Sequence, residues 1–370
     1  MEYRILPHGG EKIGIIGMGS SVIGAQPEEE IIAAVRAAYE SGVNYFDMAG
    51  GHAAIFAAYG KALQGIRDKV YLQIHFGADY TSGEYGWTTE LDEIKKSVAW
   101  QLENLQTDYI DVGFIHCLDE ESDLAAYQAN GVLDYVLDLK KQGVIRHIGL
   151  SSHTPALVNK VLDMGIVDVV MFSINPSYDY GQGDFGIGGN TERYDMYRRC
   201  QREGVAITVM KPFCGGQLLD AAQSPFGVAL TREQCIQYAL DKPGVMTVLP
   251  GFGSEKEMHE VLSFFDASEE ARDYACLGHL APDGAVGRCV YCKHCHPCPA
   301  GLDIALINKY YDLAVQGDNL AREHYLTLEK RAGDCIACGH CDSRCPFRVA
   351  QSQRMETPRT YFGARARSIG

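Results

Sequence analysis

Two cysteine-rich runs lie near the end of the chain. The second run has the spacing C-x2-C-x2-C-x3-C-P that is typical of bacterial ferredoxins, and the first has two residues, not three, before its last cysteine. Three thiolates at this spacing hold one face of a [4Fe–4S] cube, and in two-cluster proteins the fourth cysteine ligates the other cluster. We therefore expect two clusters with crossed ligands: one on Cys289, Cys292, Cys295 and Cys345, the other on Cys335, Cys338, Cys341 and Cys298.

Zinc and disulfides are the two alternatives for these cysteines. Zinc also uses C-x2-C pairs, but it takes four ligands, and two full sets of four, each followed by proline, favour clusters. A disulfide framework does not require this regular spacing, and 13 cysteines in a chain with no secretory signal indicate metal binding. Because all eight ligand positions are filled, we expect the clusters to transfer electrons and not to act on a substrate themselves.

A second group of residues has the types needed for acid–base or metal chemistry. Asp47, His75 and His116 each end a short apolar run, and His52 follows in the loop after the first run. If the runs are neighbouring parallel strands, the four side chains converge at one edge, and we expect them to meet around one cavity.

Three uses of this cavity remain open. In the first, Asp47 holds His75 in its charged form, and His52 or His116 gives a proton to a developing alkoxide. A tyrosine from a nearby loop could replace that donor, the candidates being Tyr80, Tyr85, Tyr178 and Tyr180. In the second, His52, His75 and His116 bind a divalent metal ion that polarises a substrate oxygen, with Asp47 as a fourth ligand or a support. In the third, the site has lost its activity.

The elements that must position these residues alternate regularly along the chain. Eight apolar, β-branched runs are separated by helical patterns, at 13–17, 43–47, 70–76, 109–116, 144–151, 167–175, 205–210 and 245–251. This alternation predicts an α/β fold, a (β/α)8 TIM barrel over residues 1–265. A doubly wound nucleotide-binding sheet is the alternative, but Gly17-x-Gly19 is followed by Val22 where the dinucleotide fingerprint needs a third glycine.

The remaining residues form a second part. We expect a junction and a helical ferredoxin-like domain over 266–350, and a polar C-terminal tail over 351–370. The net charge of −15 argues against nucleic acid and anionic membranes as partners, since both require a cationic face. No apolar stretch approaches the roughly 20 residues that span a bilayer, so we expect a cytoplasmic protein. The sequence leaves open whether the chain forms an oligomer.

Several motifs in this order resemble the aldo-keto reductases, above all the branch with a C-terminal ferredoxin domain. They are "GVNYFDMA", "DKVYLQI", "YIDVGFIH", "GVIRHIGLSSH", "MKPFCGG" and "LPGFGS". The resemblance covers nearly the whole chain and implies a (β/α)8 barrel that binds a nicotinamide cofactor and transfers hydride to a carbonyl. It also implies a catalytic tetrad of Asp, Tyr, Lys and His. Asp47 and His116 match, whereas His52 stands at the tyrosine position and His75 at the lysine position.

The resemblance also implies a cofactor site. Ser151 and Ser152 stand where the family holds the carboxamide, and Met210 followed by Lys211 stands where a tyrosine stacks under the nicotinamide. A helix start with Gly251, Gly253 and Ser254 could hold a pyrophosphate or could be a plain turn. Because Glu255 and Glu257 flank the single Lys256, NAD(H) is favoured over NADP(H) if a dinucleotide binds.

Together these features predict an oxidoreductase of aldo-keto reductase type. We expect it to couple a small organic substrate in the barrel to electron transfer through the two clusters and an external electron carrier. A metal-dependent lyase or isomerase with structural clusters is one alternative. An electron-transfer subunit with an inactive barrel is the other.

Overall fold

The protein is described from a computed structural model that covers residues 1–181, 186–274, 277, 289, 295–315, 319–345 and 348–365. The chain forms two compact units. The first, which we call the barrel unit, comprises residues 1–175, 190–213 and 230–274. The second, which we call the cluster unit, comprises residues 176–189, 214–229 and 275–370. The boundaries expected from the sequence, after residues 265 and 350, remain predictions.

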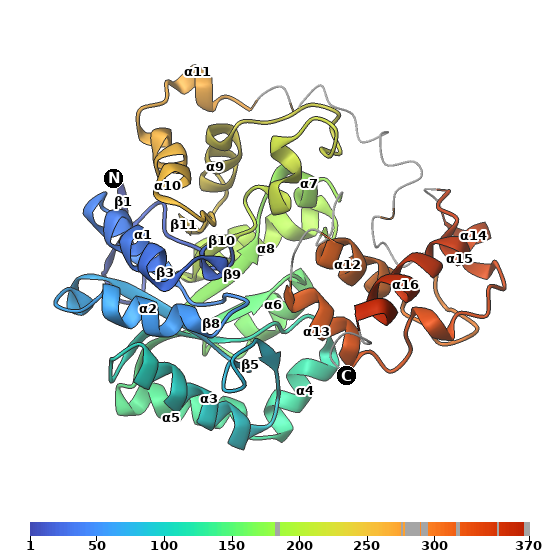
Figure 1. The fold of residues 1–370 in the computed structure, drawn as a ribbon, viewed down its shortest axis with the longest axis horizontal. Helices are drawn as coiled ribbons and strands as arrows, with labels where there is room; N and C mark the ends of the chain where they lie inside the picture. The colour runs from blue at the N-terminus through green and yellow to red at the C-terminus, as the bar shows by residue number, and fades with distance from the viewer. Residues whose placement is uncertain are drawn as a thin grey trace. The chain divides into compact units, whose positions relative to one another are not determined.

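Seven strands of the barrel unit form one parallel sheet in the order β11-β10-β9-β8-β7-β4-β3 (Figure 1). Their bounds are β3 Tyr45–Asp47, β4 Tyr71–Phe76, β7 Ile110–Ile115, β8 Ile145–Ser152, β9 Val169–Ser173, β10 Ala206–Met210 and β11 Val245–Val248. Parallel bridges from Ile16 to Val248 and from Met18 to Phe46 join the two edge strands through the segment 16–19. The chain therefore forms the expected (β/α)8 barrel.

The first apolar run, expected as a strand over 13–17, is divided between two structures. Its start belongs to β2 (Lys12–Gly14), which pairs antiparallel with β1 (Tyr3–Ile5), and only the following residues close the barrel. A Cβ at Gly17 would lie 2.8 Å from the carbonyl oxygen of Tyr45, so this position requires glycine for close backbone approach. Gly17 therefore serves barrel closure and is not part of a dinucleotide loop.

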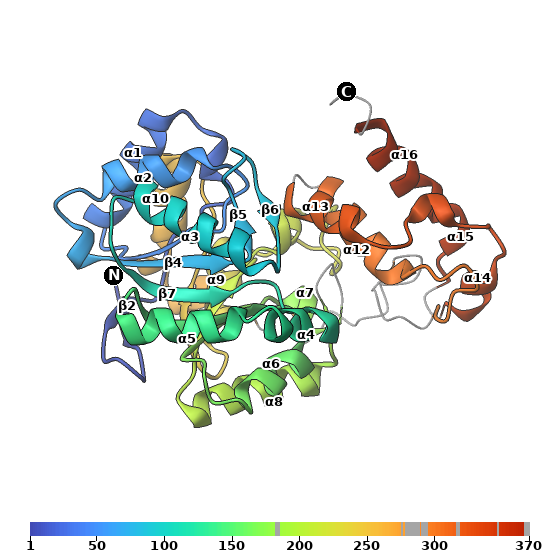
Figure 2. The same ribbon diagram turned by 90° about the horizontal axis from the view of Figure 1, so that it is seen from below.

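Helices follow the strands and cover the outside of the barrel (Figures 1 and 2). Two of these helices begin with typical start signals: α1 begins directly after Pro27 with three glutamates, and α9 has a capping box of Thr231 and Gln234. The helices are α1 Glu28–Glu40, α2 Ala54–Ala62, α3 Leu91–Asn104, α4 Glu121–Ala129, α5 Val132–Gln142, α6 Pro155–Leu162, α8 Asn190–Glu203, α9 Arg232–Leu240, α10 Glu255–Leu262 and α11 Glu269–Arg272. A small hairpin of β5 (Ala78–Asp79) and β6 (Gly86–Trp87) follows β4.

A hydrophobic core links the strands with the N-terminal hairpin. Residues two apart on a strand share one face, as Val112 and Phe114 do on β7 and Val169 and Met171 do on β9. The core consists of Leu6, Ile13, Tyr45, Val112, Phe114, Val169, Met171, Ala206, Met246 and Leu249.

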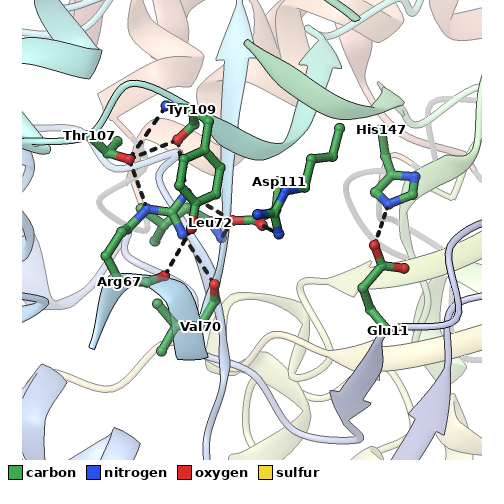
Figure 3. Close-up of polar contacts among 9 residues, drawn as sticks. Glu11, Arg67, Val70, Leu72, Thr107, Tyr109, Asp111 and His147 are labelled. Atoms are coloured by element: carbon green, nitrogen blue, oxygen red, sulfur yellow. Dashed lines mark hydrogen bonds and ion pairs between the residues drawn. The ribbon is translucent and has the colours of Figure 1, made fainter. Parts of the chain in front are cut away.

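A buried carboxylate holds the amino-terminal ends of three strands together (Figure 3). Asp111 at the start of β7 is 1% exposed, accepts the Leu72 N–H at 2.9 Å, and pairs with Arg67 and Arg146, each at 2.9 Å. Both guanidinium groups lie over the ring of Tyr109, 4.1 and 4.4 Å from its centre. Asp47, His75 and His116 lie at the other, carboxyl-terminal end of the strands. The Asp111 contacts therefore hold the barrel together and are not part of that group.

The cluster unit is helical where it is described. It contains α7 Pro176–Asp179, α12 Ile304–Val315, α13 Asn319–Thr327, α14 His340–Arg344, α15 Gln351–Arg354 and α16 Glu356–Arg365. The segment predicted as a polar tail therefore forms two helices, and the rings of Phe362 and Tyr325 stack with centres 3.8 Å apart. Within the described ranges, no helix is long and apolar enough to cross a bilayer.

Candidate active site

Two adjacent strands bring the acidic and basic groups of the site together. Asp47 at the end of β3 is in register with Gln73 on β4, and His75 lies two residues further along β4 on the same face. His116 directly follows β7, whose Phe114 is in register with His75. Pairing of parallel strands therefore places Asp47, His75 and His116 at one end of the barrel, as the sequence predicted.

The three side chains form an unbroken hydrogen-bonded chain with a fourth, Tyr85. Asp47 Oδ1 is 3.0 Å from His75 Nε2, His75 Nδ1 is 3.0 Å from His116 Nδ1, and His116 Nε2 is 2.9 Å from Tyr85 Oη. All four residues are buried, with exposed fractions between 1% and 6%. We call this set the relay.

Donor and acceptor rules give the relay two proton arrangements. An ionised Asp47 only accepts, as its 2.7 Å hydrogen bond from Gln73 Nε2 requires. With both histidines neutral, His75 then donates to Asp47, His116 donates to His75, and the Tyr85 hydroxyl donates to His116. One added proton makes His75 a donor at both nitrogens. His116 must then donate from Nε2 to the Tyr85 hydroxyl oxygen.

His52 does not join the relay through any contact of the described residues. Its Nδ1 lies 3.5 Å from Glu84 Oε2, its side chain is 34% exposed, and its backbone forms a bridge to Glu84. His52 therefore fastens the start of α2 to the loop that carries Tyr85. Of the four residues predicted to meet, Asp47, His75 and His116 lie in hydrogen-bond contact, whereas His52 lies apart from them and Tyr85 is the fourth member of the relay.

The metal alternative at His52, His75 and His116 finds no support in this geometry. Both ring nitrogens of His75 and both of His116 are within hydrogen-bond distance of protein groups, so none faces outward as a ligand.

The four candidate tyrosines of the loops are not equivalent. Burial, together with the charge of Asp47, raises the pKa of Tyr80 well above its ordinary value, and its buried hydroxyl has no hydrogen-bond partner. Tyr178 and Tyr180 belong to the cluster unit. Tyr85 alone among the four has a hydrogen bond to the histidine pair in the described structure. The sequence signal for it was weak, a tyrosine in a loop after a strand.

A clamp fixes the position of His116. The Tyr127 hydroxyl donates to the carbonyl oxygens of Phe76 at 3.0 Å and of His116 at 3.2 Å, and so ties the ends of β4 and β7 together. Gly77 has φ +107°, and a Cβ there would lie 2.0 Å from this hydroxyl. Glycine at position 77 is therefore needed for Tyr127 to reach both strands.

The residues expected to contact a nicotinamide lie at the carboxyl ends of strands in the barrel unit. Ser151 and Ser152 end β8, and Met210 ends β10 in register with Ser173. The Ser152 hydroxyl donates to the Leu118 carbonyl oxygen at 2.6 Å, so it fixes a loop. Lys211 has φ +55°, and its carbonyl oxygen accepts from Asn175 Nδ2 at 2.9 Å.

The expected pyrophosphate site already contains a carboxylate of this chain. Glu257 Oε2 accepts the Gly253 N–H at 2.7 Å, and the Ser254 hydroxyl caps α10 by accepting the Glu257 N–H at 3.2 Å. Gly251 forms a parallel bridge to Gly19 and has a role in closing the barrel. The helix start is therefore satisfied internally, and its nearest charge is negative.

The cluster cysteines lie in the cluster unit, and seven of the eight are described, Cys292 lying outside the described residues. Cys289 of the first run and Cys345 of the second share one neighbour: Gln351 Nε2 is 3.5 Å from Cys289 Sγ and 4.0 Å from Cys345 Sγ. Cys295 and Cys341 are buried, Cys298 and Cys335 are half-buried, and Cys338 is exposed. Thiolates suit iron–sulfur clusters, and the two sulfurs beside Gln351 come from different runs.

Comparison with known sequences assigns both parts of the chain. The profile of the Aldo/keto reductase family matches residues 15–234. The chain belongs to this family. A second profile, that of a 4Fe-4S dicluster domain, matches residues 288–350. An aldo/keto reductase barrel is thus followed by an iron–sulfur domain, as the motifs predicted.

Individual relatives agree with this family membership. L-galactose dehydrogenase of Arabidopsis thaliana is 26% identical over 295 residues, which cover 70% of this chain and 86% of that protein. D-galacturonate reductase of Fragaria ananassa is 25% identical over 298 residues, which cover 72% and 86%. The structure of an aldo-keto reductase from Bacillus halodurans in its holo form matches with a TM-score of 0.61 at 22% identity, covering 76% of this chain and 96% of that one. The protein is an oxidoreductase of the aldo/keto reductase family that carries a 4Fe-4S dicluster domain.

Proposed function

We propose that the barrel interconverts a hydroxyl and a carbonyl group on a small organic substrate, with Tyr85 as the residue that exchanges the proton. The observation that supports this is the relay, in which His116 and His75 connect the Tyr85 hydroxyl to the buried carboxylate of Asp47. Tyr85 would replace the tyrosine that the family places where this chain has His52.

The relay supplies a path for one proton in each direction. In oxidation the substrate hydroxyl gives its proton to Tyr85, while Tyr85 gives its own to His116 Nε2 and His116 Nδ1 gives one to His75 Nδ1. The proton then rests on His75 beside the Asp47 carboxylate, where the two opposite charges attract each other. In carbonyl reduction the same transfers run backwards and Tyr85 protonates the developing alkoxide.

The electrons of this reaction are proposed to leave through the cluster unit. Oxidation of a CH–OH group to a carbonyl releases two electrons and two protons. The relay would take the hydroxyl proton. The carbon-bound hydrogen would leave with both electrons as hydride to a nicotinamide, where one is bound, and re-oxidation of that nicotinamide would release the second proton and the two electrons. When bound, [4Fe–4S] clusters each supply one-electron transfer, so two clusters match the two electrons. An external electron carrier would accept them, and a cytoplasmic location would suit such a carrier. The crossed ligand sets are supported by Gln351 Nε2, which lies 3.5 Å from Cys289 Sγ and 4.0 Å from Cys345 Sγ.

Two further features narrow the substrate and the cofactor. The relatives named above act, by their names, on L-galactose and D-galacturonate, which supports a polyhydroxylated substrate. If a nicotinamide dinucleotide takes part, Glu257 at the start of α10 disfavours the additional phosphate of NADP(H) and leaves NAD(H). Ser151, Met210 and Lys211 would then lie along its nicotinamide.

The proposal is tested with the anaerobically purified, iron-loaded protein. A panel of sugars, sugar acids and their oxidised forms is added with NAD(H), NADP(H) or a one-electron viologen dye, and bleaching of the cluster absorbance is followed. Tyr85→Phe should lower the substrate-dependent rate by a factor of about 10² to 10⁴, the usual contribution of a positioned acid or base. Tyr80→Phe is the matched control, because Tyr80 is also a buried tyrosine of this loop and lies outside the relay.

The other outcomes separate the remaining functions. Conversion of a substrate with no cluster bleaching and no dinucleotide would indicate a lyase or isomerase. Cluster reduction by a carrier with no response to any substrate would indicate an electron-transfer subunit with an inactive barrel. Equal rates for wild type and Tyr85→Phe would exclude Tyr85 as the proton donor.

A further inference from the structure

A chain of polar side chains in the cluster unit ends on two cysteine sulfurs. Arg354 forms an ion pair with Asp312, and its Nε donates to Asn308 Oδ1 at 3.0 Å. Asn308 Nδ2 in turn is 2.7 Å from Gln351 Oε1 and 3.3 Å from Cys289 Sγ. Gln351 Nε2 completes the chain at 3.5 Å from Cys289 Sγ and 4.0 Å from Cys345 Sγ.

The direction of each hydrogen bond in this chain is fixed by chemistry. A guanidinium only donates, so the Asn308 atom that faces Arg354 must be its oxygen and its NH₂ group must face Gln351 and Cys289. Because that NH₂ group donates to Gln351, the Gln351 atom that receives it must be oxygen. The NH₂ group of Gln351 is thereby turned toward the sulfurs. Arg354 thus prevents both amides from flipping.

The amides are also removed from water. Asn308 on α12 has no exposed surface, and Gln351 at the start of α15 is 2% exposed. A hydrogen bond to a negatively charged acceptor is stronger in a buried site, because water does not compete for the donor. Both oriented NH₂ groups face Cys289 Sγ, and that of Gln351 also faces Cys345 Sγ, so they act on the charge of a cluster that these thiolates ligate.

The cysteines of the other ligand set have a different environment. Cys335 Sγ accepts the backbone N–H of Ala337 at 3.4 Å, and Cys338 is exposed. Among the described contacts, no side-chain amide donates to the sulfurs of Cys335, Cys338, Cys341 or Cys298. The two ligand sets are therefore unequal in the donors that face them.

We propose that Asn308 and Gln351 raise the reduction potential of the cluster ligated by Cys289 and Cys345 and leave the other cluster unaffected. Reduction adds one negative charge that spreads over the sulfurs, and N–H donors stabilise that charge. Arg354 acts through Asn308, as a positioning residue. The inference rests on the two clusters and crossed ligands of the proposed function.

The test compares Gln351→Met, which keeps the side-chain length and removes the amide, with Gln353→Met. Gln353 lies on the same helix and is exposed, so it serves as the matched control. The anaerobic holoprotein is titrated with a reductant, and each cluster is followed by electron paramagnetic resonance. In Gln351→Met one of the two clusters should become harder to reduce, by about tenfold in its oxidised-to-reduced ratio or about 59 mV. The second cluster and the control should match wild type.

Iron analysis and a second variant decide the remaining outcomes. Arg354→Met leaves both amides in place but removes the group that orients them, so it should shift the same cluster in the same direction by less. The proposed effect on the reduction potential would be overturned by any of three results in Gln351→Met and Arg354→Met. These are unchanged potentials at full iron content, equal shifts of both clusters, and loss of iron from both variants. A wild-type protein with far fewer than about eight iron atoms per chain would instead refute the two-cluster function itself.

Discussion

Asp47 is the one carboxylate in the relay, and its Oδ1 lies 3.0 Å from His75 Nε2. In the proposed transfer, the proton would come to rest on His75 beside this carboxylate. Gln73 holds Asp47 from a second direction at 2.7 Å, so the carboxylate cannot turn away from the histidine. In the proposed mechanism, Asp47 would therefore be a positioning residue that acts on the substrate through three other side chains.

Asp47→Asn should therefore impair the reaction without displacing the side chain. Because the amide cannot stabilise a charged His75, we expect kcat/KM to fall by a factor of about 10² to 10⁴ and its dependence on pH to change. The measurement is a pH profile of the rate with the best substrate of the panel. Asp92→Asn, at an exposed position on α3, is the control and should behave as wild type. A loss of less than about threefold would show that the carboxylate charge is not used.

The residues of the relay show what strand periodicity predicts and where it stops. Asp47, His75 and His116 lie at strand ends, and the register of parallel strands brings strand ends together. His52 and Tyr85 lie beyond the strand ends, where the chain path depends on turns. The β5–β6 hairpin folds residues 80–85 back, so that Tyr85 reaches His116 and Glu84 reaches His52. No spacing rule in the sequence distinguishes Tyr85 from Tyr80.

At the scale of elements, the β1–β2 hairpin is fastened to the barrel by titratable groups. His147 Nε2 on β8 lies 2.9 Å from Glu11 Oε1, and Asp168 binds His8, Lys140 and the Ile148 N–H. Burial alone would lower the pKa of His147, but its bonds to Asp168 and Glu11 outweigh this and raise it. Burial would likewise raise the pKa of Asp168, yet His147 and Lys140 hold it well below its ordinary value.

These shifts predict how the hairpin responds to pH. A histidine whose pKa is raised in the folded state stabilises the attachment of the hairpin below about pH 6.5. This stabilisation is lost as pH rises through the folded-state pKa of the histidine. An aspartate whose pKa is lowered in the folded state stabilises the attachment above about pH 4. This stabilisation is lost as pH falls through the folded-state pKa of the aspartate. The hairpin should therefore be held most firmly between about pH 4.5 and 6.5 and open more readily toward pH 9.

Amide hydrogen exchange in residues 3–14, corrected for the intrinsic rate at each pH, measures this opening. In His147→Gln the loss of protection above pH 6.5 should disappear, whereas His259→Gln on the exposed face of α10 should keep it. A pH dependence that is identical in wild type and His147→Gln would contradict the assignment.

The element pattern was otherwise strongly encoded in the sequence. Buried parallel strands read as continuous apolar runs, and seven of the eight runs form the expected strands because both faces of each are covered. The prediction of a barrel strand over 13–17 was wrong in part, because Lys12–Gly14 pairs with residues 3–5. The local sequence pattern does not determine which segment these residues pair with. The two helices of the segment 351–365 were not predicted, because they have little apolar periodicity and Phe362 packs against a partner distant in the sequence.

At the scale of the whole molecule, the two units should depend on iron to different degrees. The barrel unit has a large apolar core and needs no ligand to bury it. In the cluster unit, residues 295–303 and 335–339 bear four of the ligand cysteines and have no regular secondary structure. Backbone of this kind is held mainly by its ligands, so metal binding and folding are coupled there.

Anaerobic removal of iron with a chelator should therefore loosen one unit and spare the other. We expect peptides that cover 295–303 and 335–345 to lose most of their protection from hydrogen exchange, while peptides that cover β4 and β7 keep theirs. The apoprotein should also retain its upper thermal transition, assigned to the barrel, because the hydrophobic core and the Asp111 ion pairs contain no iron ligand. Equal loss of protection in both units would mean that the barrel folds only together with the clusters, and would make the clusters structural as well as electron-transferring.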